Sequence, residues 1–96
     1  MTAAQPQPLF VLFVVHCYDD LLKGLIARRK SLGLTQLHLD QIAGWADGLT
    51  GKYESGKRIK GLGPLGLLTA LQALDLELVA VPRGRPITRM KGAAGC

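Results

Sequence analysis

Residues that end helices divide the middle of the chain into short segments, and this division limits the fold more than any other feature. Gly33, Gly44 and Gly56 each follow a stretch with helical spacing, and glycine is the residue that most readily ends a helix. Pro64 suits the first position of a further helix. The predicted helices run from Asp19 or Asp20 to Gly33, from Thr35 to about Ala43, from about Asp47 to Ser55, and from Pro64 onward.

One face of these segments is apolar, as expected for helices that pack on a shared core. The inward residues are Leu21, Leu22, Leu25, Ile26 and Leu32 in the first segment, Leu39, Ile42 and Ala43 in the second, and Leu65, Leu68, Leu71 and Leu74 in the fourth. The basic residues of the first segment point elsewhere and gather in its last turn, where cations suit the helix dipole. They are Lys23, Arg28, Arg29 and Lys30.

Two apolar runs flank the helices and predict β-strands. The first covers residues 10–15 and the second covers residues 76–81, which Pro82 bounds. The predicted fold class is therefore mainly α with short β-strands at both ends. Residues 1–8 are expected to form a disordered tail, residues 9–82 the folded domain, and residues 83–96 a basic flexible tail.

Composition favours an acidic partner in the cytoplasm. The chain has 96 residues, a net charge of +5 and an isoelectric point near 9.6, which suits nucleic acid or an anionic membrane surface. The apolar run at residues 9–15 is far too short to span a membrane, and it lacks the basic region of a signal peptide. His16, Cys17, His38 and Cys96 lack the spacing of zinc ligands, so we expect no metal and no cofactor. Because no nucleophile has a neighbouring base, we do not expect an enzyme.

Two short motifs at fixed separation point to a family. Leu34-Thr35-Gln36 opens the second predicted helix, Gly44 falls at a turn, and Glu54, Gly56, Lys57 and Arg58 close the third. Over about residues 21–76 the sequence resembles the XRE family, the helix-turn-helix domains of phage lambda-type repressors and Cro. The resemblance implies a lambda-repressor-like bundle of four or five helices that binds DNA, encoded by a bacterium, a phage or a mobile element.

Two residues depart from the family pattern. Asp40 stands where the family usually has a small Ala in the first motif helix, and Thr50 stands where its recognition helix usually has Ile or Val. The first of these positions lies where the two motif helices touch. We expect Ala43 to supply the close contact instead, with the second helix slightly rotated.

The resemblance assigns the DNA contacts. Thr35 and Gln36 begin the helix whose N-terminus faces a phosphate, and the recognition helix presents its first residues to base edges. Asp47 either accepts from cytosine N4 or caps its helix, and capping is the favoured interpretation. Residues implied to face the major groove are Asp47, Gly48, Leu49 and Lys52, and those implied to bind phosphate are Lys57, Arg58 and Lys60.

The ends of the domain predict a dimer and an extra DNA contact. The run at residues 76–81 resembles the end of antitoxins of the HipB kind, in which the strand pairs across a two-fold axis; here its partner is the same strand of a second copy or the strand at residues 10–15. The expected interface residues are Phe10, Leu12, Val14, Leu76, Leu78, Val79 and Val81. Arg83 and Arg85 match the core of an AT-hook, and they would contact either the minor groove or phosphates.

These features predict a sequence-specific transcriptional repressor that binds double-stranded DNA as a homodimer on a palindromic operator. Two alternatives stay open. One is an antitoxin that binds both DNA and a toxin, and the other is a protein-binding module that has lost DNA binding.

Overall fold

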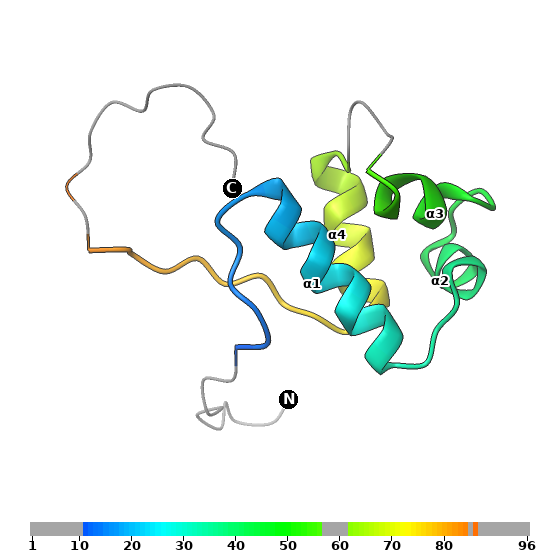
Figure 1. The fold of residues 1–96 in the computed structure, drawn as a ribbon, viewed down its shortest axis with the longest axis horizontal. Coiled ribbons are helices and arrows are strands. Elements are labelled where there is room, and N and C mark those ends of the chain that lie inside the picture. The colour runs from blue at the N-terminus through cyan, green and yellow to red at the C-terminus, as the bar shows by residue number, and fades with distance from the viewer. Residues whose placement is uncertain (1–10, 57–61, 85, 87–96) are drawn as a thin grey trace, which may run out of the picture.

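A computed structural model describes residues 11–56, 62–84 and 86, and this part of the chain is a bundle of short helices (Figure 1). The helices of the described part are α1 (Tyr18–Ser31), α2 (Gln36–Ala43), α3 (Leu49–Glu54) and α4 (Pro64–Ala73). The sequence analysis predicted these helices in this order. Among the described residues, no helix is long and apolar enough to cross a membrane.

The N-cap of α1 lies two or three residues before the predicted one. Cys17, rather than Asp19 or Asp20, is the N-cap, and its Sγ accepts a hydrogen bond from the backbone N of Asp20 at 3.5 Å. Asp19 and Asp20 lie in the first turn, where their charge suits the helix dipole.

The bounds of α2 confirm the prediction from its capping residues. The hydroxyl of Thr35 accepts a hydrogen bond from the backbone N of His38 at 3.0 Å, and so satisfies one of the amides that a helix start leaves unpaired. Gly44 ends the helix with φ of +73°, a left-handed conformation that glycine adopts without strain.

The core is a cluster of four leucines from three segments. Leu25 of α1, Leu39 of α2, and Leu71 and Leu74 at the end of α4 are all buried there. Arg28 of α1 also donates to the backbone O of Leu74 at 3.0 Å and so ties α1 to the end of α4.

The apolar face predicted for α4 is wrong at its N-terminal half. Leu65 and Leu68 are exposed, Leu65 by 81%, whereas Ala70 is buried beside Leu71. A repeat of three residues drifts by about 60° per step around an α-helix, so Leu65 and Leu74 lie on opposite sides. Only the second half of the leucine series can therefore face the core.

The two predicted strands are not formed in the single described chain. Residues 11–15 and 76–81 belong to neither helix nor strand. Phe13 packs against the core, with its ring over Gly24, where a side chain would clash with it. Leu76 also packs on the core, and its backbone N donates to the O of Leu71 at 2.8 Å. Leu76 thus serves the core of its own chain.

Most of the remaining predicted interface residues are exposed. Leu12 and Val14 flank Phe13 and are exposed, as are Val11 and Val15, so Phe13 is the residue of this segment that packs on the core. Leu78, Val79 and Val81 are each more than half exposed. Phe10 lies outside the described residues.

Candidate nucleic-acid interface

The predicted recognition helix, α3, is shorter than expected and begins without a cap of its own. It spans Leu49–Glu54, and the backbone of Gly48 just before it is left-handed, with φ of +95°. The capping role predicted for Asp47 is wrong. The N-cap position is Gly48, one residue later, which forms no side-chain cap bond, and Asp47 itself is exposed. Glycine at position 48 tolerates this backbone because it has no Cβ.

Asp40 of α2 takes the place of the missing cap. One of its carboxylate oxygens, Oδ2, accepts from the backbone N of Gly48 at 2.8 Å. The other, Oδ1, accepts from the backbone N of Thr50 at 2.8 Å and from the Thr50 hydroxyl at 2.6 Å. A carboxylate at a helix N-terminus is favourable because both the amides and the helix dipole are positive there.

The two departures from the family pattern are thus one hydrogen-bonded unit. Asp40 is 1% exposed and Thr50 is 0% exposed, so their polar atoms are paired by hydrogen bonds within the protein rather than by water. Burial by itself raises the pKa of Asp40, but the hydrogen bonds from Thr50 and Gly48 outweigh it and hold the pKa below the ordinary value of 3.8. The expectation that Ala43 replaces this contact is therefore unnecessary, since Asp40 and Thr50 fill it together.

A second buried polar cluster fastens the end of α3. Arg29 of α1 forms a two-pronged ion pair with Glu54, with nitrogen–oxygen distances of 2.7 and 2.9 Å. The remaining guanidinium nitrogen donates to the backbone O of Leu34 at 2.7 Å. The prediction that Arg29 points away from the core is wrong, because its charge is neutralised by Glu54 inside the fold.

Gln36 joins this cluster from the first turn of α2. Its side-chain nitrogen donates to Glu54 at 2.9 Å, so one of its two amide hydrogens is committed within the protein. The side-chain oxygen of Gln36 lies beside Gly51, where a Cβ atom would approach it to 3.2 Å. The start of α2 and the middle of α3 therefore lie together, as the predicted interface requires.

An aromatic pair supports the turn between α2 and α3. The rings of Trp45 and Tyr53 meet edge to face, with centroids 5.8 Å apart. The backbone N of Trp45 donates to the O of Asp40 at 2.8 Å. Burial raises the pKa of Tyr53 to about 12. Trp45 is thus an anchor of the turn rather than an exposed stacking platform.

Most of the other predicted DNA-contact residues are either exposed or lie outside the described residues. Thr35, Gly48 and Lys52 are exposed, and Leu49 is half-buried. Arg83 is exposed on the segment after α4. Lys57, Arg58, Lys60 and Arg85 lie outside the described residues.

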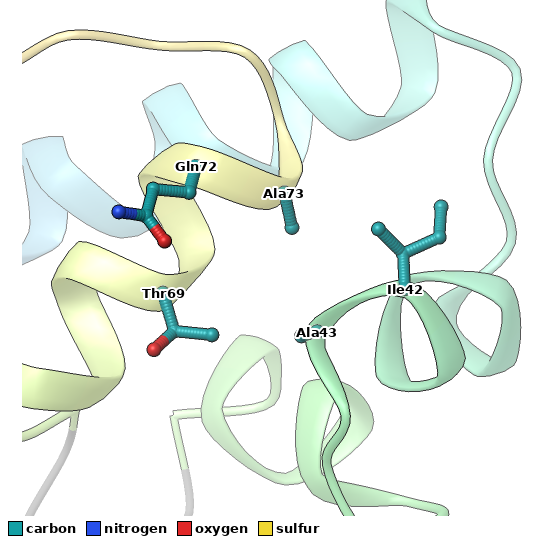
Figure 2. A pocket seen from close by; sticks show the side chains of 5 residues that line it. All are labelled: Ile42, Ala43, Thr69, Gln72 and Ala73. Atoms are coloured by element: carbon teal, nitrogen blue, oxygen red, sulfur yellow. The ribbon is translucent and has the colours of Figure 1, made fainter.

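A shallow hollow of about 270 Å³ lies between α2 and α4 (Figure 2). Its walls are Ile42, Ala43, Thr69, Gln72 and Ala73. The lining residues carry no titratable group, and the Thr69 hydroxyl already donates to the O of Leu65 at 2.9 Å. None of the predicted DNA-contact residues lines this hollow.

The sequence analysis did not predict that three residues hold the two ends of α3 in place. They are Arg29, Asp40 and Glu54. A signal for Asp40 was present, because a carboxylate stands where the family usually has a small Ala at the contact between the two motif helices. Arg29 gave no such signal, since it stands in a run of basic residues on a helix. Comparisons with protein-family models, curated proteins and solved structures found no match to this chain.

Proposed function

We propose that this chain is a helix-turn-helix DNA-binding protein that acts as a transcriptional repressor, with α3 as its recognition helix. One observation carries the proposal: α3 is fixed to α2 by the buried Asp40–Thr50 unit and to α1 by the buried Arg29–Glu54 pair, while Lys52 on α3 stays exposed. A helix that presents polar groups to a DNA groove must be held rigidly, because base recognition depends on where its hydrogen-bond donors lie relative to the base edges.

The proposed contacts follow from chemistry at α3 and at the start of α2. Lys52 donates to guanine O6 or N7, and Leu49 contacts a thymine methyl. Gly48 has no side chain and allows a close approach to the DNA. The N-terminus of α2, at Thr35 and Gln36, faces a phosphate.

Basic residues outside α3 supply the part of the affinity that does not depend on sequence. Lys57, Arg58 and Lys60 directly follow α3 in the sequence, and Arg83 and Arg85 begin the basic tail. Lysine and arginine at phosphates release counterions, which makes binding weaken as salt rises. The net charge of +5 supports this role and a cytoplasmic location on bacterial or phage DNA.

A homodimer completes the proposal. The exposed apolar residues that precede α1 and follow α4 pair across a two-fold axis, as strands or as packed extended segments. They are Leu12, Val14, Leu78, Val79 and Val81. Two recognition helices related by this axis would lie roughly 34–36 Å apart and read an imperfect palindrome.

The test is selection of bound DNA from a random pool, followed by titration of Lys52→Ala on the selected site. We expect the substitution to weaken binding by about 1–3 kcal/mol and to relax the preference at one base pair. Lys23→Ala is the matched control, because Lys23 is an exposed lysine on α1 that pairs only with Asp19 in the described structure. Unchanged affinity and preference for Lys52→Ala would remove α3 from the recognition role.

A protein-binding function is the second candidate, favoured by the exposed apolar residues at 78–81. The same residues would suit a toxin partner if the chain is an antitoxin. Filter binding of the parent protein to genomic DNA at low and moderate salt separates these functions. A module that has lost DNA binding retains no DNA even at low salt, whereas an antitoxin retains it.

A further inference from the structure

We propose that Asp40, a residue of α2 that touches no DNA in the proposed complex, is the positioning residue of the recognition helix. The inference rests on the proposed function and names the group that sets where α3 lies relative to α2. Its basis is the unit formed by the Asp40 carboxylate, the Thr50 hydroxyl and the amides of Gly48 and Thr50.

α3 cannot fix its own start. It has six residues and so barely more than one turn, and isolated helices of that length do not persist in water. Gly51 in its middle and the left-handed Gly48 at its start add backbone freedom that the fold must restrain. The first amides of α3 therefore need an acceptor from elsewhere.

Asp40 is well placed to supply that acceptor because α2 is itself fixed. Thr35 caps its start and Gly44 ends it. The backbone O of Asp40 also holds the N of Trp45 in the turn. One residue therefore bonds the turn, the N-cap position and the first turn of α3, through three different oxygen atoms.

Thr50 and Asp40 depend on each other. Three donors satisfy the buried carboxylate, and one of them is the Thr50 hydroxyl at 2.6 Å. Asparagine at position 40 could keep the two bonds from Thr50, but its NH2 group would then face the Gly48 amide, donor against donor. An isosteric change would thus loosen the start of α3 without leaving a cavity.

The consequence for recognition is geometric. Lys52 lies two residues after Thr50, so a shift at the start of α3 moves its amine relative to a base edge. Phosphate contacts tolerate such a shift far better, because they are longer-ranged and less directional. Loss of Asp40 should therefore reduce selectivity more than it reduces non-specific binding.

The experiment compares Asp40→Asn with Leu71→Ala, a core change in α4 that lowers stability without touching the Asp40 unit. Amide hydrogen exchange is followed by NMR at Gly48, Thr50 and the core residues of α1 and α4. The quantity to compare is the exchange rate of the Gly48 amide divided by that of the core amides. We expect this ratio to be roughly ten- to a hundredfold higher in Asp40→Asn than in the parent protein. Leu71→Ala should speed exchange at all of these sites together.

The second readout is the ratio of affinities for the selected site and for unrelated DNA. Asp40→Asn should lower this ratio at least about tenfold while changing non-specific binding by less than about twofold. Thr50→Val should lower it too, and the double variant Asp40→Ala/Thr50→Val should regain thermal stability over Asp40→Ala without regaining selectivity. Recovered selectivity in the double variant would show that apolar packing suffices and would overturn the proposal.

The two ideas fail separately. If the parent protein binds no DNA at low salt, the proposed function is wrong, and the exchange readout alone decides whether Asp40 positions α3. If Asp40→Asn leaves the exchange of Gly48 and Thr50 unchanged relative to the core, Asp40 does not position α3, whatever the protein binds.

Discussion

At the scale of single residues, the buried polar groups around α3 differ in how well they are satisfied. The carboxylate of Asp40 accepts three hydrogen bonds, whereas the hydroxyl of Tyr53 is buried with no hydrogen-bond partner among the described residues. A satisfied buried group is nearly neutral or mildly stabilising, and an unsatisfied one costs free energy. The two residues should therefore respond in opposite ways to the loss of their polar atoms.

Tyr53→Phe removes the unsatisfied hydroxyl and keeps the ring against Trp45. We expect the free energy of unfolding to stay the same or to rise by about 1 kcal/mol, as measured by urea denaturation. Thr50→Val is the contrasting variant, because valine has nearly the volume of threonine but lacks its hydrogen-bonded hydroxyl. We expect it to lower the free energy of unfolding by about 1–3 kcal/mol. A clear loss of stability in Tyr53→Phe would reveal a partner for the hydroxyl in solution.

Asp40 also predicts a dependence of stability on pH. Its pKa in the fold lies below the ordinary value of 3.8, so its contribution to the unfolding free energy is fully present above that value. The contribution is lost as pH falls through the lowered pKa, because the folded state must then take up the proton against its hydrogen bonds. We therefore expect the difference in unfolding free energy between the parent and Asp40→Asn, measured from pH 7 down to pH 2, to decrease below the ordinary aspartate pKa of 3.8. A difference that stays constant over this pH range would contradict the prediction.

At the scale of elements, α3 is held from both neighbouring helices. Arg29 of α1 binds Glu54 at its end, and Asp40 of α2 binds its start. Gln36 of α2 adds a bond to Glu54. A helix of six residues is therefore defined by its surroundings at both ends, and this allows it to have Gly48 at its N-cap position and Gly51 in its middle.

Arg29→Met tests the fastening at the end of α3. The change keeps a long apolar stem but leaves the buried Glu54 carboxylate without its cation, so we expect a loss of about 3 kcal/mol in unfolding free energy. The double variant Arg29→Met/Glu54→Met should recover most of the loss, because no charge is then left buried. Lys23→Met, at the exposed pair with Asp19, should have no measurable effect on stability. A single Arg29 variant as mild as Lys23→Met would show that the pair is weak in solution.

At the scale of the whole molecule, a small core is accompanied by exposed apolar segments. Four leucines form the buried cluster, and a chain of 96 residues has little further surface to bury. The exposed Leu78, Val79 and Val81 would gain from a partner surface. The proposed symmetric dimer would supply that surface and would also set the spacing of the two proposed recognition helices.

Val79→Pro tests the dimer. Proline removes a backbone donor, so it prevents strand pairing at residues 76–81. We expect the parent to sediment as a dimer at micromolar concentration, and the variant to dissociate or aggregate and to lose selected-site binding far more than non-specific binding. Leu65→Ala, on the exposed side of α4, is the control and should leave the dimer intact. A parent monomer that binds a single half-site with full affinity would exclude the dimer.

The sequence by itself determined the local structure of this protein. Thr35, Gly44 and Pro64 act through backbone geometry and hydrogen bonds to near neighbours, so the bounds of α2 and the start of α4 could be predicted from them. The exposure of Lys52 agrees with the position that the resemblance to the XRE family implies for it.

Only the tertiary structure decided which polar residues face inward. Asp40 and Thr50 are ten positions apart, and Arg29 and Glu54 are twenty-five apart, so nothing local indicates that they bond. The sequence likewise did not determine which face of α4 is buried. The helix is almost wholly apolar, so no polar face marks its exposed side, and packing against the other helices decides which residues are buried. Residues 76–81 lack a strand for the same reason, since a strand exists only when a second strand accepts its hydrogen bonds, and the described part of one chain provides none.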